Sequence, residues 1–265
     1  MKKNTKVIAV ANQKGGVGKT TTAVNIAAEL RQRKNTVLVI DLDPQNSLST
    51  TYLKDSSPKA TIAEIMTSVI DRETMDYDSC IAHNELNDID YIPATISLTK
   101  VERQLVVTRH AETVLRKGLD KLTKDYDYII IDCPPSLSTL LYNALCAADY
   151  VVVPVIAQVA ALDGVPLLLD TISEVQENDN SELDILGYIE TVYEEQTKMS
   201  QDVKETLIEN FGDKFLGYIS KSTNAPASSA DGLAFCKYKR NNTNKYYNKL
   251  SDEYSCIVDK LIERM

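Results

Sequence analysis

The stretch of sequence that decides the fold occupies residues 11–21 and reads Ala11-Asn12-Gln13-Lys14-Gly15-Gly16-Val17-Gly18-Lys19-Thr20-Thr21. An apolar run over residues 7–10 precedes it, and a helical pattern over residues 23–30 follows it. A strand, a glycine-rich loop and a helix in this order are the context in which such a loop binds phosphate. Glycines allow a tight turn that points N–H groups at an anion, and the helix adds its positive N-terminal end. The stretch therefore predicts a nucleotide-phosphate site.

Two side chains at the end of this loop have defined uses in phosphate chemistry. Lys19 supplies a positive charge for the outer phosphates, and the Thr20 hydroxyl is placed to ligate Mg²⁺. The common pattern G-x-x-x-x-G-K-[ST] requires glycine at position 13, where this chain has Gln13. A second lysine, Lys14, stands at the start of the loop instead. The loop is therefore a variant of the common phosphate loop.

Two later strands are predicted to end in carboxylates near this loop. The apolar run 36–40 leads into Asp41 and Asp43, and the run 128–131 leads into Asp132. In open parallel sheets the ligand lies at the carboxyl ends of the strands, so these side chains should face the loop. One of Asp41 and Asp43 can assist the metal while the other orients or deprotonates a water, and Asp132 would hold Mg²⁺ opposite Thr20. The predicted chemistry is phosphoryl transfer to water.

Length and composition limit the class of protein. The 265 residues suit one α/β domain, and we expect a single domain over residues 1–265 without an N-terminal DNA-reading extension. Five widely spaced cysteines without a C-x-x-C pair indicate reduced thiols. No apolar run approaches the length of a signal peptide core or a membrane span, so we expect a cytoplasmic protein. The net charge of −9 argues against a surface that is basic throughout.

The order of the predicted elements indicates the fold class. Strands and helices alternate, which predicts a doubly wound, mainly parallel sheet flanked by helices on both faces, as in P-loop NTPases. The acidic stretch 76–87 is expected to be a loop, Ser97 is a candidate N-cap, and His110 is expected to open a helix. Further strands are predicted over residues 89–93, 150–156, 183–192 and 215–219, and further helices over residues 199–211 and 250–262.

Three motifs resemble those of the ParA/MinD family of ATPases, and in particular its ParA/Soj-type partition ATPases. They are K-G-G-V-G-K-T at residues 14–20, D-L-D-P-Q at residues 41–45 and I-I-D-C-P-P-S at residues 130–136. The resemblance implies an ATP site made by Lys14, Gly15, Gly16, Val17, Gly18, Lys19, Thr20 and Thr21.

The resemblance also implies individual roles. Lys14 matches a signature lysine that reaches the nucleotide of the other subunit in a dimer, so it joins Lys19 among the catalytic residues. The D-L-D-P-Q motif matches the family's first switch segment. In it, Asp43 matches the residue tied to water activation, and Asp41 belongs to the switch and the metal environment. Lys221 lies in a loop that is expected near the adenine base of the nucleotide. The chain departs from the family at residues 157–159, where Ala-Gln-Val replaces Cys-Glu-Tyr, and at Ser220, where proline is usual.

A segment near the C-terminus is positively charged, in contrast to the negative net charge of the whole chain. Residues 237–249 contain five basic residues and no acidic one, with polar and tyrosine residues between them. In a chain of net charge −9, this segment predicts contacts with the phosphate backbone of DNA. The alternative is an ordinary solvated loop and helix start. The candidate DNA-binding residues are Lys237, Lys239, Arg240 and Lys245.

The resemblance implies an ATPase that partitions plasmid or chromosomal DNA. ATP would join two subunits, the homodimer would bind DNA nonspecifically and stay on the nucleoid, and hydrolysis stimulated by a centromere-binding ParB-like partner would release it.

A MinD-like membrane-cycling regulator would need a basic amphipathic C-terminal helix, whereas residues 250–263 carry acids on the polar side. An iron–sulfur reductase component would need two cluster cysteines in each subunit at the positions of its family, whereas Cys133 lies in the I-I-D-C-P-P-S motif at residues 130–136. A tyrosine kinase would lack Lys14. A nucleotide switch without hydrolysis remains open if Asp43 is not positioned to act.

Overall fold

The structure is a computed structural model that describes residues 4–52, 59–156, 164–223, 225–241 and 245–265. One eight-stranded sheet forms its centre, with the strand order β3-β4-β2-β5-β1-β6-β7-β8. Every neighbouring pair is parallel except β3 and β4. The strands are β1 (Lys6–Val10), β2 (Val37–Asp41), β3 (Ala82–Asn84), β4 (Ile89–Ile92), β5 (Tyr128–Asp132), β6 (Tyr150–Ile156), β7 (Asp184–Tyr193) and β8 (Phe215–Ser220).

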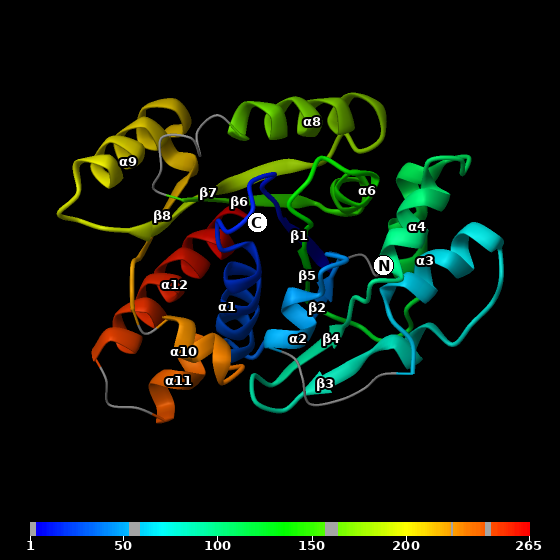
Figure 1. Ribbon diagram of the computed structural model, residues 1–265, viewed down its shortest axis with the longest axis horizontal. Coiled ribbons are helices and arrows are strands. Elements are labelled where there is room, and N and C mark those ends of the chain that lie inside the picture. Colours follow the sequence, from blue (N-terminus) through cyan, green and yellow to red (C-terminus); the bar gives the residue numbers. More distant parts are fainter. Residues whose placement is uncertain (1–3, 53–58, 157–163, 224, 242–244) are drawn as a thin grey trace.

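Helices cover both faces of the sheet, as the alternation predicts (Figure 1). One face is covered by α1 (Lys19–Gln32), α2 (Ser47–Thr51), α10 (Ala225–Ala230), α11 (Phe235–Asn241) and α12 (Lys245–Arg264). The other is covered by α3 (Ile62–Asp71), α4 (Leu98–Leu105), α5 (Val114–Leu119), α6 (Thr139–Ala147), α8 (Gly164–Asn178) and α9 (Lys198–Phe211). Three short 3₁₀ helices lie in the connections. They are η1 (Tyr77–Cys80) between α3 and β3, η2 (Ala111–Thr113) between α4 and α5, and η3 (Gly212–Lys214) between α9 and β8. The doubly wound, mainly parallel fold is confirmed.

The central strands are buried on both faces, which explains their almost continuous apolar sequences. All five residues of β2 are buried, and so are four of the five residues of β5. The register sets the ends of three strands level, because Asp132 is paired with Val10 on one side and with Asp41 on the other. The two carboxylates therefore emerge side by side at the edge from which the phosphate loop begins.

The structure corrects two local expectations and confirms the position of a third, the N-cap at Ser97. The acidic stretch 76–87 is not all loop: its residues 82–84 form β3, an antiparallel edge strand in which Ala82 and Asn84 are buried. Three residues are too few to show a strand pattern. Ser97 occupies the N-cap of α4 without a side-chain bond, and His110 precedes a 3₁₀ turn, so the helix α5 begins only at Val114.

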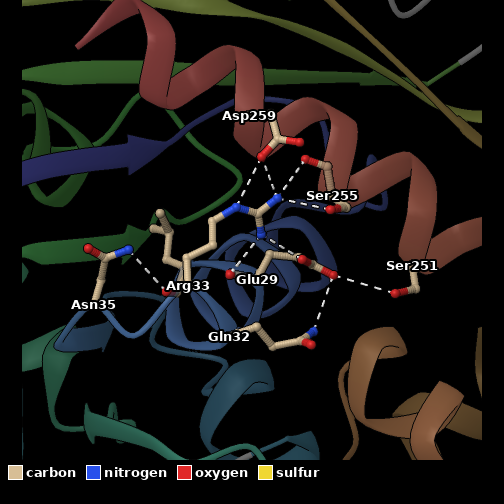
Figure 2. A network of polar contacts seen from close by, with 8 residues as sticks. Glu29, Gln32, Arg33, Asn35, Ser251, Ser255 and Asp259 are labelled. Atoms are coloured by element: carbon tan, nitrogen blue, oxygen red, sulfur yellow. Dashed lines mark hydrogen bonds and ion pairs between the residues drawn. The ribbon is translucent and has the colours of Figure 1, made fainter.

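The helix that follows the phosphate loop is tied to the C-terminal helix by one polar network (Figure 2). Arg33, at the end of α1, donates to Asp259 Oδ1 at 2.6 Å from Nη2 and to Ser255 Oγ at 2.9 Å. The same guanidinium donates to Glu29 Oε2 at 2.8 Å, and that carboxylate is nearly buried. Arg33 thus neutralises a carboxylate between the two helices, which fixes α12 against α1.

No helix in the described part of the chain is both long enough and apolar enough to cross a membrane.

Candidate functional site

The loop between β1 and α1 faces open space on one side and is held by hydrogen bonds on the other. Gly16 and Gly18 adopt left-handed φ angles of 74° and 82°, which favour glycine. A Cβ atom added at Gly15 or Gly16 would meet nothing within 4 Å, so the main chain faces open space there. Beneath the loop, Asn12 Nδ2 donates to Pro154 O at 2.7 Å, and Asn12 Oδ1 accepts from the Lys14 N–H at 2.9 Å. These contacts preform a cradle for an anion.

Lys19 is held inside this cradle. Its side chain is nearly buried, and Nζ donates to the carbonyl oxygen of Lys14 at 3.1 Å. Burial lowers the pKa of Lys19, while the nearby Asp132 opposes that shift. A buried ammonium group that lacks a full counter-charge is stabilised by an anion. The geometry therefore fits the predicted contact of Lys19 with phosphate.

Thr20 and Asp132 meet at the first turn of α1. Thr20 Oγ1 donates to Asp132 Oδ2 at 2.7 Å. Asp132 is buried, and its other oxygen, Oδ1, has no hydrogen-bond partner among the described residues. Burial raises the pKa of Asp132 well above its usual value, and the neighbouring Asp41 adds to the shift. A buried carboxylate with an unsatisfied oxygen beside a hydroxyl is a donor set that fits Mg²⁺.

Larger clusters of metal ligands do not occur in the described residues. No group of three or more His, Cys, Asp or Glu side chains is placed there to hold a metal ion. Mg²⁺ in phosphoryl-transfer sites is usually bound by one or two side chains, with phosphate and water completing its shell. Thr20 and Asp132 match that arrangement.

Asp41 and Asp43 occupy different environments. Asp41 is buried, and its Oδ2 accepts from the Ser49 N–H at 2.9 Å and from Ser49 Oγ at 2.6 Å. Its Oδ1 accepts from the Asp43 N–H at 3.1 Å. Burial raises the pKa of Asp41 to about 6, although the bonds from Ser49 oppose the shift. Asp41 thus holds the segment 41–49 in place, and its predicted contact with the metal stays a prediction.

Asp43 is half-buried, and among the residues that the structure describes its carboxylate accepts one hydrogen bond, from the Gln45 N–H to Oδ1 at 2.9 Å. It is also close enough to Lys19 and Asp132 to influence the pKa of each. The structure therefore brings Asp43 to the phosphate loop with a carboxylate oxygen available for a water molecule. Its assignment to water activation stays a prediction.

A cavity of about 320 Å³ adjoins the loop on the side of β7 and β8. Its lining includes Gly18 and Thr21 from the loop region and Lys221 from the segment after β8. Lys221 Nζ forms an ion pair with Glu194 Oε1 at 2.9 Å. The position beside the phosphate cradle suits a nucleoside, which is where Lys221 is expected.

Several supporting residues carry no sequence signal of their own. Thr191 Oγ1 donates to the Val17 carbonyl at 2.9 Å, so β7 supports the loop from 174 residues away. Thr22 Oγ1 and Tyr254 OH lie 3.2 Å apart, and the Phe235 N–H donates to Asn25 Oδ1 at 2.8 Å. The first turns of α1 are therefore bonded directly to α11 and α12. Pairs so distant in sequence could not be found by motif spacing.

The predicted DNA-binding residues lie on α11 and α12. Lys237 is half-buried on α11. Lys239 and Arg240 follow on the same helix and Lys245 begins α12, but their side chains lie outside the described residues. Residues 157–159, where the chain departs from the family motif, lie outside them as well. These assignments stay predictions.

Comparisons with known proteins agree with this geometry. A family described as AAA domain matches residues 5–185. The sporulation initiation inhibitor protein Soj of Bacillus subtilis is 41% identical over 210 residues, which cover 79% of this chain and 81% of Soj. A solved structure of a putative plasmid partition protein from Borrelia burgdorferi B31, bound to AMPPNP, has a TM-score of 0.79 at 28% identity and covers 98% of this chain and 99% of that protein. Cobyrinic acid a,c-diamide synthase from Mycobacterium smegmatis, with bound ADP and magnesium, has a TM-score of 0.77 at 31% identity, with coverage of 94% and 92%.

Proposed function

Because this chain belongs to the ParA-type family of P-loop ATPases, we propose that it hydrolyses ATP in order to partition plasmid or chromosomal DNA. The partition assignment is supported by the likeness to the Borrelia protein over almost its whole length. The ATPase assignment is supported above all by the contact of Thr20 with the buried Asp132 beneath an open glycine-rich cradle. Residues 1–265 act as one ATPase domain.

The residues of the cradle have distinct tasks in hydrolysis. The main chain around Gly15 and Gly16 and the ammonium of Lys19 bind the phosphates, and Thr20 and Asp132 hold Mg²⁺. Magnesium, when bound, neutralises the charge that develops on the transferred phosphoryl group. Asp43 orients a water molecule for attack and takes up its proton. Asp41 keeps Asp43 in position through its bond to the Asp43 N–H.

Dimer formation is the second part of the proposal. Lys14 stands where the family has its signature lysine, on a loop whose main chain faces open space. In the proposed dimer, Lys14 of one subunit contacts the nucleotide of the other, so ATP joins the two subunits. Replacing Lys14 with alanine should leave ATP binding by the monomer intact and abolish the ATP-dependent dimer in light scattering. A dimer that forms equally well in the variant would refute the contact between subunits.

DNA binding is the third part. The basic segment includes Lys237, Lys239 and Arg240 on α11 and Lys245 at the start of α12, and both helices are bonded to α1 close to the phosphate loop. The ATP-bound dimer binds DNA there without sequence preference and stays on the nucleoid. A centromere-binding partner stimulates hydrolysis, after which the subunits separate and leave the DNA.

The decisive experiment measures DNA binding with ATP, with ADP and without nucleotide. We expect binding with ATP that weakens steeply as salt is added, because phosphate contacts release counterions. The triple variant Lys237→Ala, Lys239→Ala, Arg240→Ala should bind at least tenfold more weakly and with a flatter salt dependence.

A matched control removes the same charge at three exposed lysines outside this segment, Lys59, Lys100 and Lys198, and should retain binding. Equal loss in both triple variants would show a general charge effect and remove the segment from the proposal. Binding that is the same in all three nucleotide states would overturn the partition function itself.

A further inference from the structure

A second large cavity lies on the opposite side of the sheet from the basic C-terminal segment. It has a volume of about 740 Å³ and lies between the end of α3, the segment after α4, and α5. Figure 1 shows α3 and α4 at the far side of the molecule from α11 and α12. The cavity shares no lining residue with the phosphate loop or with the nucleoside cavity. It is therefore a separate site.

The charge of this cavity is opposite to that of the whole chain. Four Arg and Lys side chains line it, against the two acids Glu73 and Asp120. The cations are Arg72, Arg109, Lys117 and Lys121, and His110 lies beside them. The chain as a whole carries −9, so this surplus of two positive charges is a local inversion. It favours a ligand with about two negative charges.

The cations are available for such a ligand. In the described part of the chain, Arg72, Arg109 and Lys117 form no ion pair with any carboxylate. Lys121 Nζ donates to the Tyr77 hydroxyl at 2.9 Å and lies 5.0 Å from the centre of the same ring, so its partner within the described ranges is a neutral side chain. A guanidinium group can donate two parallel hydrogen bonds to two oxygens of one phosphate. Such charge-assisted hydrogen bonds are stronger than those between neutral groups.

The cavity also has an apolar part. Val69 and Ile70 from α3 and the buried Val114 from α5 line it, and they belong to or pack against the main hydrophobic core. Pockets of 300–1,000 Å³ that combine apolar walls with a few charged groups are typical of small-molecule sites.

We propose that this cavity binds a small phosphorylated organic molecule. Its phosphate contacts Arg72, Arg109 and Lys117, and its apolar body lies against Val69 and Val114. This inference is independent of DNA partition, because the site shares no residue with the machinery of hydrolysis or DNA binding.

The test uses 1-naphthyl phosphate as the probe, since it carries a dianionic head on an aromatic body. The full chain is first saturated with ADP and Mg²⁺, so that the phosphate loop cannot bind the probe. Calorimetry should then show one molecule of probe bound for each chain. Neutral 1-naphthol and inorganic phosphate should each bind at least tenfold more weakly, because each offers only half of the contacts.

Variants connect the binding to the cavity. Arg72→Ala with Arg109→Ala should weaken probe binding at least tenfold, and Lys117→Glu alone should have a similar effect. The matched control, Lys100→Ala with Arg103→Ala on α4, removes the same charge outside the lining and should bind the probe as the wild type does. Thermal unfolding of every variant confirms that it is folded.

Four results would overturn the proposal. The first is the absence of saturable binding at millimolar probe, and the second is equal binding by the double variant and the wild type. The third is inorganic phosphate that binds as tightly as the probe, which would indicate an adventitious ion only. An acidic peptide that binds the cavity in place of the probe would likewise assign it to a protein partner.

Discussion

The hydrogen bonds and ion pairs of Arg33 predict how much stability the protein loses when this side chain is replaced. Replacing Arg33 with methionine keeps the aliphatic stem and removes the guanidinium (Figure 2). Two carboxylates then lose their cation, and they differ in exposure. The Glu29 side chain is 5% exposed, whereas the Asp259 side chain is 59% exposed. Water can replace the arginine at Asp259 but not at Glu29.

The two losses therefore have different magnitudes. An exposed pair such as Arg33–Asp259 contributes about 0–1 kcal/mol. Removing one partner of a fully buried pair costs roughly 3–5 kcal/mol, and the 23% exposure of Arg33 reduces that range. Within the described part of the chain, the Glu29 carboxylate would keep only its long contacts to Ser251 at 3.4 Å and Gln32 at 3.5 Å. We expect Arg33→Met to lower the free energy of unfolding by about 2–3 kcal/mol, or roughly 5–10 °C in Tm.

The assay is urea unfolding followed by circular dichroism, with two companion variants. Asp259→Asn should lower stability by less than about 1 kcal/mol. The double variant Glu29→Leu with Arg33→Met removes both charges, so it should recover most of the loss. The effect of Arg33→Met should persist in 0.5 M salt, because the pair with Glu29 is shielded from ions.

Two outcomes would refute this reasoning. If Arg33→Met costs no more than Asp259→Asn, the buried carboxylate does not depend on the guanidinium. If the double variant loses as much as the sum of Glu29→Leu and Arg33→Met, the two side chains are not energetically coupled.

Three further predictions concern the site and the core. Asp43→Ala should lower the rate of ATP hydrolysis by about 10²–10⁴-fold while the ATP-dependent dimer still forms; loss of nucleotide binding would contradict its role. Thr20→Ala should abolish the magnesium dependence of nucleotide affinity in a titration with EDTA-treated protein, and an unchanged dependence would exclude the hydroxyl as a ligand. Glu190 is buried without a hydrogen-bond partner among the described residues, and burial raises its pKa to about 7, although Lys204 opposes the shift. Its native pKa lies above the unfolded value near 4.5, so wild-type stability falls as pH rises from about 4.5 to 7. Glu190→Gln should therefore gain stability relative to wild type across that window, by up to about 3 kcal/mol; parallel stability curves would contradict this.

Much of the nucleotide site could be predicted from the sequence because its determinants are local. The glycines around Gly16, the lysine and threonine that begin α1, and the aspartates at the strand ends each act within a few residues of a recognisable pattern. Apolar runs fixed the parallel strands, since a strand buried on both faces leaves almost no choice of side chain. The antiparallel strand β3 was not predicted, because three residues at the edge of a sheet are too few to show an alternating apolar and polar pattern.

The tertiary structure alone decided which distant residues support these local motifs. Ser49 bonds both Asp41 and the Ala94 N–H, Thr191 supports the loop at Val17, and Arg33 joins α1 to α12. Each contact links segments whose distance along the chain is unrelated to their distance in space. The cavity between α3 and α5 arises in the same way, because Arg72 and Arg109 are 37 positions apart and meet only when the helices pack. Sequence determines the chemistry that a short segment can perform, whereas packing determines which segments perform it together.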